Sequence, residues 1–189
     1  VSDVEIEYVP AARAARPVAV HEARVASMDL LAPDVMRVRL EVEGGRRIDF
    51  YAGQYINILL DDGQKRAFSF ATAPHEPGPI ELHIRRIEGG RFTTHVFTAM
   101  KVGERVRFEG PVGSFFLRED GEKPVIFVAV ATGFAPVKSM VEHDFHAGVK
   151  RQMVLYWGTR RLADMYLREL PERWAAEHPN FTFVPVLSD

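Results

Sequence analysis

The sequence predicts two domains in series: a six-stranded antiparallel β-barrel of Greek-key-like type, then an incomplete α/β domain of the doubly wound class. Three observations predict this. Short segments of alternating apolar residues fill residues 21–117, with turn residues between most of them. The composition then changes at Lys123-Pro124. Beyond that point, continuous apolar runs alternate with helix-like stretches, which indicates a parallel sheet with crossover helices.

Length and composition limit the function classes. The chain has 189 residues, with 47% hydrophobic residues, 26% charged residues and a formal net charge of −2, which is unfavourable for a nucleic-acid surface. It contains no cysteine, which excludes disulfides, cysteine-ligated iron–sulfur clusters and cysteine nucleophiles from this chain. No apolar run reaches the ~20 residues of a membrane span and no signal peptide is visible, so we expect a cytoplasmic protein without a membrane span.

Residues 1–20 are expected to be a linker. A short alternating stretch is followed at residues 11–17 by Ala-Ala-Arg-Ala-Ala-Arg-Pro, which has neither strand alternation nor a lasting apolar face. Because the chain begins with valine, we interpret this stretch as the tail of a missing upstream module and expect the chain to be a fragment.

Residues 21–120 form the expected barrel domain. Ala-Pro-Asp at residues 32–34 and Asp-Asp-Gly at residues 61–63 supply turns between neighbouring strands. Close spacing of short strands favours a closed or partly closed barrel over an open sheet. Strands are predicted at residues 23–30, 35–42, 55–60, 66–70, 80–86 and 105–109.

Residues 121–189 form the expected α/β domain, half of a doubly wound nucleotide-binding sheet. The run at residues 125–130 is apolar throughout, which is typical of a strand buried on both faces. A three-stranded parallel sheet with uncovered edges is marginal, so we expect this domain to be truncated. Strands are predicted at residues 125–130, 153–157 and 181–187, and helices at residues 136–146 and 164–177.

The stretch Arg66-Ala67-Phe68-Ser69 combines a cation, an aromatic ring and a hydroxyl. A buried strand rarely carries an arginine unless an anion meets it, whereas on an edge strand the arginine would simply be solvated. Gly89-Gly90 leads into Arg91-Phe92-Thr93, which is either a hairpin turn with a threonine cap or a loop that offers backbone N–H groups to an anion. Together with Arg85, these groups would neutralise a pyrophosphate. Alternation does not explain how Phe68 and Ser69, on opposite faces, would reach one ligand.

Other segments carry weaker signals. Residues 80–86 alternate, which by itself indicates a half-buried strand with Glu81, His83 and Arg85 on a polar outer face. The segments 132–136 and 157–161 follow strands at the carboxyl edge where dinucleotides bind, although G-x-G-x-x-G is absent. Arg160 or Arg161 would meet a ribose or its 2′-phosphate, but solvated side chains are the preferred interpretation of these two arginines. Seven histidines show no metal-binding spacing, and no Gly-x-Ser-x-Gly elbow supports a hydrolase.

These motifs resemble the ferredoxin–NADP⁺ reductase superfamily over residues 21–189. The family's R-x-[YF]-[ST] corresponds to residues 66–69, its G-x-x-[ST] to residues 90–93, and its A-G-G-T-G-x-A-P region to residues 128–136. Residues 80–85, 89–93 and 108–117 are similar to one branch, the CDP-6-deoxy-glucoseen reductase-like proteins and related oxygenase reductases. Free-flavin reductases are also similar over residues 66–72 and 80–84.

The resemblance implies an FAD-binding barrel and an NAD(P)-binding domain. It implies that Arg66 pairs with the flavin phosphate, that Phe68 packs on the isoalloxazine, and that Ser69 hydrogen-bonds the N5 atom that receives hydride, which makes Ser69 the catalytic residue. The implied cofactor-binding residues are Arg66, Ala67, Phe68, Ser69, His83, Ile84, Arg85, Gly90, Arg91, Phe92, Thr93, Thr132, Gly133, Pro136, Gly158, Thr159 and Arg160.

The implied function is hydride transfer from NADH or NADPH to FAD, followed by electron transfer to an iron–sulfur centre on a module or partner outside this chain. The sequence departs from the family where Val130 and Ala131 replace paired glycines, in a loop that approaches the dinucleotide. Two alternatives therefore stay open. One is an enzyme that reduces free flavin as a substrate, and the other is a flavin-binding module without nucleotide turnover.

Overall fold

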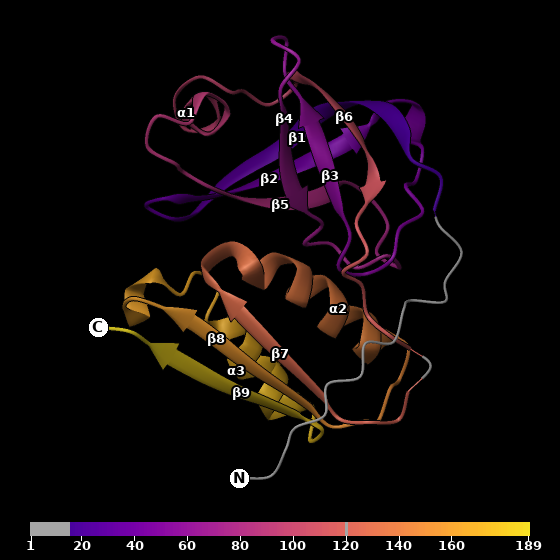
Figure 1. Ribbon diagram of the computed structural model, residues 1–189, viewed down its shortest axis with the longest axis vertical. Helices are drawn as coiled ribbons and strands as arrows, with labels where there is room; N and C mark the ends of the chain where they lie inside the picture. The colour runs from indigo at the N-terminus through magenta and orange to yellow at the C-terminus, as the bar shows by residue number, and fades with distance from the viewer. Residues whose placement is uncertain (1–15, 120) are drawn as a thin grey trace, which may run out of the picture.

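The described residues, 16–119 and 121–189 of a computed structural model, form two sheets (Figure 1). The first sheet is antiparallel and the second is parallel. Residues 1–15 of the expected linker lie outside the described part, and the first strand already begins at Ala19. The strands of the first sheet are β1 (Ala19–Ala32), β2 (Val35–Val42), β3 (Tyr55–Leu59), β4 (Lys65–Ser69), β5 (Ile80–Arg85) and β6 (Arg105–Val112). A short 3₁₀ turn, η1 (Glu43–Gly45), follows β2, and the helix α1 (Arg91–Thr98) follows β5.

Alternating apolar residues build the first core. One face of each strand supplies its aliphatic side chains, such as Leu40 of β2, Ile56 of β3 and Leu82 of β5, which are buried in one cluster. Phe50 stacks on Phe70 within this cluster, with 3.9 Å between the ring centroids. Burial of this face fixes the strand register, because a slip of one residue would turn these side chains to solvent.

The first sheet is not closed into a barrel. Its strand order is β4-β3-β6-β1-β2-β5, so β4 and β5 are its two edges. Just beyond β4, the N–H of Ala71 donates to the carbonyl of Glu81 at 2.8 Å, but no ladder joins the two strands themselves in the described residues. The expectation of a β-barrel was therefore wrong in its closure. Alternation identifies strands, whereas pairing of the two last edges depends on contacts between distant segments.

The second sheet has the order β7-β8-β9. Its strands are β7 (Val125–Val130), β8 (Met153–Thr159) and β9 (Phe181–Leu187), and its helices are α2 (Phe134–His146) and α3 (Glu169–Glu177). Phe127, Leu155 and Trp157 face the helices and are buried with Phe134 and Trp174. Two 3₁₀ turns, η2 (Ala131–Gly133) and η3 (Leu162–Asp164), precede the helices.

The opposite face of β7 differs from the expectation of burial on both sides. Ile126, Val128 and Val130 are 66%, 73% and 70% exposed, because the helices that the structure describes cover one face of this sheet only. The second helix also begins later than expected, at Glu169 rather than at residue 164. Leu167 has a φ of 58°, which no right-handed helix accommodates, so η3 and α3 are separate.

The helix α2 lies along the boundary between the two sheets (Figure 1). From this helix, Lys138 Nζ donates to the carbonyl of Ala71 at 3.0 Å, and Ser139 Oγ donates to the carbonyl of Thr72 at 2.7 Å. These hydrogen bonds attach α2 to the segment between β4 and β5. None of the helices within the described ranges is long and apolar enough to cross a membrane.

Candidate functional site

A cavity of about 650 Å³ lies at the open gap between the edge strands β4 and β5. The gap left by the missing β4–β5 ladder is thus the entrance to a site of the size that binds cofactors. Its lining comes from β4, β5 and residues 87–93, and from η2 and the start of α2. The sequence-predicted residues that line it are Arg66, Ala67, Phe68, Ser69, His83, Arg85, Gly90, Phe92, Thr93, Thr132, Gly133 and Pro136.

The edge position of β4 explains how consecutive residues reach one cavity. Ala67 is exposed, and Phe68 and Ser69 are half-buried, yet all three line the same space. A ligand that lies along the free edge of a strand meets side chains from both faces. Phe68 also contacts Phe92 of α1, with 5.6 Å between the ring centroids. The strand order therefore explains how Phe68 and Ser69, which point to opposite faces of β4, line one cavity.

The loop before α1 provides backbone donors. The first N–H groups of any helix have no intrahelical partner. In α1 the N-cap residue is Gly90, which has no side chain to cap them. The hydroxyl of Thr93 is engaged inside the loop, where it accepts from the N–H of Ile87 at 3.1 Å and donates to the carbonyl of Gly90 at 3.1 Å. Thr93 thus fixes the loop with its side chain and leaves anion binding to the backbone.

Two arginines contribute positive charge at this cavity. Arg66 donates to Gln64 Oε1 and to the carbonyl of Lys65, and its side chain lies along the cavity wall. Arg85 forms an ion pair with Asp34 at 2.7 Å, an acidic partner that the sequence motifs do not identify. A phosphate that binds Arg85 must share the guanidinium with this carboxylate.

Two predicted residues, Ile84 and Arg91, line neither this cavity nor the second one described below. Ile84 is 1% exposed and belongs to the core of the first sheet. Arg91 points away, with a side chain that is 75% exposed and pairs with Asp62. Both belong to motifs that line the cavity, but alternation and helix geometry turn their side chains elsewhere.

A second cavity of about 390 Å³ adjoins the first. The predicted residues Gly158, Thr159 and Arg160 line it, at the carboxyl end of β8. Arg85 and Thr132 line both cavities, so the two spaces meet at these residues. Two ligands, one in each cavity, would therefore approach each other across this boundary.

The turn between β7 and α2 forms one wall of the second cavity. Val130 and Ala131, which replace the family's glycines, both line it. Ala131 has a φ of 48°, the left-handed conformation that glycine adopts without strain. The alanine thus takes a backbone conformation that suits glycine. Compared with glycine, it adds only a methyl group to this turn.

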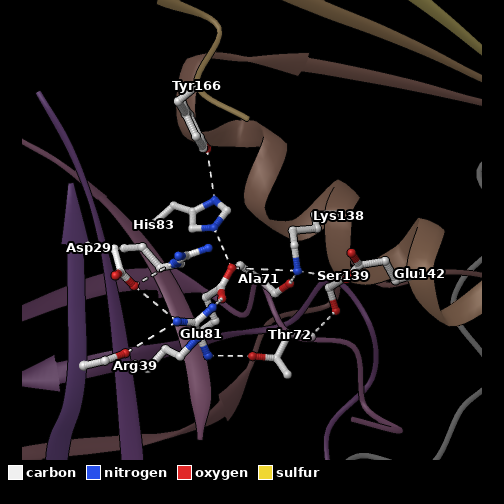
Figure 2. A network of polar contacts seen from close by, with 12 residues as sticks. Asp29, Arg39, Ala71, Thr72, Glu81, His83, Lys138, Ser139, Glu142 and Tyr166 are labelled. Carbon is white, nitrogen blue, oxygen red and sulfur yellow. Dashed lines mark hydrogen bonds and ion pairs between the residues drawn. The ribbon is translucent and has the colours of Figure 1, made fainter. Parts of the chain in front are cut away.

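A buried polar network joins the two sheets beside the cavities (Figure 2). Glu81 Oε1 accepts from His83 Nε2 at 2.9 Å, while its Oε2 pairs with Arg39 at 2.8 Å. The hydroxyl of Tyr166 lies 3.1 Å from His83 Nδ1. Lys138 Nζ lies 3.7 Å from Glu81 Oε1 and 2.9 Å from Glu142 Oε2. Glu81 and His83, expected on a polar outer face, are therefore buried beside α2 and Tyr166, whereas Arg85 on the same face of β5 is exposed.

The pKa values in this network follow from burial and charge. Burial alone would raise the pKa of Glu81, but the hydrogen bond from His83 and the charges of Lys138, His83 and Arg39 lower it to about 2. Burial lowers the pKa of His83 despite the opposing effect of Glu81, and burial raises the pKa of Tyr166. These directions assign a neutral imidazole that donates from Nε2 to Glu81 and accepts from the Tyr166 hydroxyl at Nδ1.

Sequence reasoning missed several of these residues. Tyr166, Lys138 and Ser139 contact segments more than 60 positions away in the chain, and no local pattern predicts such contacts. For Glu81 the sequence offered a partial signal, because Glu81 and His83 are two positions apart and therefore share one face of the strand. The remaining missed residues of the first cavity are Ile87, Glu88, Gly89 and Ala135, next to motifs that were identified.

Comparison with known proteins adds family information. The family model for the oxidoreductase FAD-binding domain matches residues 22–117, and the one for the oxidoreductase NAD-binding domain matches residues 127–189. The chain is 41% identical over 167 residues to terephthalate 1,2-dioxygenase reductase component 1 of a Comamonas species, covering 88% of this chain and 49% of that protein.

Two further similar proteins are also reductases. CDP-6-deoxy-L-threo-D-glycero-4-hexulose-3-dehydrase reductase of Yersinia pestis is 40% identical, covering 86% of this chain and 48% of that protein. The crystal structure of the Amycolatopsis cytochrome P450 reductase GcoB matches with a TM-score of 0.86 and 35% identity, covering 94% of this chain and 54% of that chain. The chain thus spans about half the length of the curated relatives that it matches.

Proposed function

Because the chain belongs to the oxidoreductase FAD-binding domain family, we propose that it is the flavin- and nucleotide-binding part of an NAD(P)H-dependent flavoprotein reductase. In this proposal it transfers hydride from NADH or NADPH to FAD and passes electrons to an iron–sulfur centre on another module or partner. The names of its relatives, which include reductase components of oxygenase systems, support the electron-transfer role. We assign FAD binding to residues 21–120, nucleotide binding to residues 121–189, and the protein to the cytoplasm.

One observation carries the proposal: two cavities meet at Arg85 and Thr132. Hydride transfer needs a donor and an acceptor in direct contact, which an enzyme achieves by binding both in fixed positions. The first cavity lies in the part of the chain matched by the FAD-binding family and is closed by the second part. The second lies mainly at the carboxyl edge of the parallel sheet, where dinucleotides bind in doubly wound folds.

The residues of the first cavity fit FAD. Its aromatic ring suits a flat ring, its hydroxyl suits a polar ring edge, and its guanidinium groups and helix N-terminus suit a pyrophosphate. In the proposal, Phe68 packs against the ring, Ser69 donates a hydrogen bond to its edge, and Arg66 pairs with the phosphate. FAD supplies a centre that accepts two electrons as hydride and releases them singly.

The chain's own contribution is binding and orientation. Ser69 is the residue that we propose for catalysis, through a hydrogen bond to the reacting edge of the ring. Thr132, Gly133 and Pro136 would border the nicotinamide, and Gly158, Thr159 and Arg160 would hold the rest of the dinucleotide. No acid–base step by the protein is needed, because hydride moves directly between the two cofactors.

Flavin retention by Arg66→Ala tests the assignment of the first cavity. The variant loses a charge-assisted contact to the phosphate, so we expect FAD affinity to fall by about 10- to 100-fold, measured by fluorescence titration of the apoprotein. Arg107→Ala is the matched control, since this exposed arginine pairs with Glu22 and does not line the cavity. Equal affinities of both variants and the wild-type chain would contradict the phosphate role of Arg66.

A further inference from the structure

The turn that borders the second cavity holds an energetically unfavourable residue. Ala131 lies in the left-handed region with a φ of 48°, and it begins the 3₁₀ turn η2 that leads directly into α2. A side chain with a Cβ disfavours this conformation, so contacts around the residue must maintain it. Ala131 and Thr132 both line the second cavity, and the shape of this turn therefore sets the shape of its wall.

Trp157 makes the contact that holds this turn. Its indole Nε1–H donates to the carbonyl of Ala131 at 3.0 Å. The same carbonyl also accepts from the N–H of Phe134, so two donors fix the orientation of the peptide group after Ala131. A carbonyl held by two donors resists the rotation that would return Ala131 to a common conformation.

The indole itself is held in place by its surroundings. Trp157 is fully buried beside Ala129 of the neighbouring strand, and it stacks on Phe134 with 4.0 Å between centroids and 10° between planes. Tyr166 meets it edge-on at 5.3 Å. Such packing leaves the indole N–H little freedom, so it acts as a rigid donor.

We propose that Trp157 is a positioning residue for the dinucleotide, because its indole N–H holds Ala131 in the left-handed conformation that shapes the wall of the second cavity. This inference rests on the proposed function, since it assumes that the dinucleotide binds there. Through this contact, an alanine keeps a conformation that glycine adopts without strain. Trp157 acts from beneath the turn and does not line either cavity.

The test compares Trp157→Phe with wild type, both loaded with FAD. Phenylalanine keeps an aromatic ring against Phe134 and removes the donor, but its ring is also smaller, so the loss of packing needs a matched control. We expect the affinity for NAD⁺, measured by calorimetric titration, to weaken by about three- to tenfold, the loss of one neutral hydrogen bond. Ala131→Gly in the same background is expected to restore the affinity to within about twofold, because glycine adopts a positive φ without a tether.

Trp174→Phe is the matched control. Trp174 is the other tryptophan of the chain and belongs to the same buried aromatic cluster, with its ring 6.0 Å from Phe134. We expect this variant to bind NAD⁺ as wild type does. An equal loss in both tryptophan variants, or no rescue by Ala131→Gly, would overturn the inference, because the effect would then be one of core packing.

Hydrogen exchange separates this inference from the proposed function. In the absence of nucleotide, Trp157→Phe is expected to speed amide exchange in the peptide of residues 130–135 by at least about tenfold and to leave β9 unchanged. If wild type binds neither NAD⁺ nor NADP⁺ but this exchange increases, the proposed function fails and the tether stands. Unchanged exchange overturns the tether whatever the affinity for NAD⁺.

Discussion

Glu142 is the acidic side chain whose charge changes near neutral pH. Burial raises its pKa from 4.5 to about 7, against the opposing effects of its ion pair with Lys138, and the charges of Glu76 and Glu81 raise the pKa further. Glu81, by contrast, stays ionised down to a pH of about 2. The pKa values of the two carboxylates that contact Lys138 are therefore shifted in opposite directions from the ordinary value.

This difference predicts a pH dependence of stability. The folded pKa of Glu142 lies above the unfolded value of 4.5, so its stabilising contribution is complete below about pH 4.5 and is lost as the pH rises through about 7. We expect wild type to lose roughly 1 to 3 kcal/mol of unfolding free energy from this residue between about pH 5 and about pH 8. Glu142→Gln should show a smaller loss in urea unfolding at the two pH values.

Glu177→Gln is the control for this prediction, because Glu177 is exposed on α3. It should keep the wild-type dependence on pH. If Glu142→Gln and wild type lose the same free energy over this range, then Glu142 ionises normally in the folded chain. Glu81 makes the opposite contribution, present above about pH 4.5 and lost as the pH falls toward about 2.

At the scale of elements, a few side chains hold α2, β5 and the segment before α3 together. Tyr166 precedes α3 and reaches the imidazole of His83 on β5, while Ser139 of α2 reaches the carbonyl of Thr72. These contacts keep the two cavities adjacent, because each cavity is lined by residues from both parts of the chain. Loss of one contact should weaken the junction without removing either core.

Tyr166→Phe tests this junction. The variant leaves Nδ1 of a fully buried imidazole without its hydroxyl partner, so we expect the unfolding free energy to fall by about 1 to 3 kcal/mol in chemical denaturation. Tyr156→Phe makes the same chemical change on the outer face of β8, where the side chain is 39% exposed, and should cost less than about 0.5 kcal/mol. A similar small effect in both variants would mean that the hydroxyl of Tyr166 does not stabilise the junction.

The sequence predicted elements better than it predicted their contacts. Strands β2, β7 and β9 were predicted with their observed bounds, because apolar alternation or a continuous apolar run is a local signal. The late start of α3 depends on the left-handed Leu167, which no periodicity indicates. Closure of the first sheet and burial of Glu81 and His83 on β5 depend on segments far apart in the chain, so local patterns gave the wrong answer for both.

The same distinction applies to the site. Arg66, Phe68 and Gly90 lie in short motifs and line the first cavity as expected. Arg91 belongs to such a motif but points away from the cavity, because its side-chain direction is set by the start of α1. Trp157 carried no sequence signal beyond its place on β8, since its role depends on the carbonyl of a residue 26 positions earlier.

At the scale of the whole molecule, the sequence resemblance is confirmed. The relatives include oxygenase reductase components and a CDP-hexulose dehydrase reductase, the branch that the motifs indicated. The arrangement of the two sheets also matches the solved reductase GcoB. The open edge of the first sheet lines the first cavity, and η2 and the start of α2 complete its wall.

In the proposed function, hydride donor and acceptor meet where the two cavities join, and anaerobic stopped-flow mixing measures the transfer between them. The FAD-loaded chain is mixed with excess NADH, and separately with NADPH, while the absorbance of the bound flavin is followed. We expect rapid single-turnover bleaching with at least one of the two nucleotides, with the flavin still bound after gel filtration. Bleaching only of flavin that has left the protein would indicate a free-flavin reductase, and a bound flavin that neither nucleotide bleaches would contradict the account.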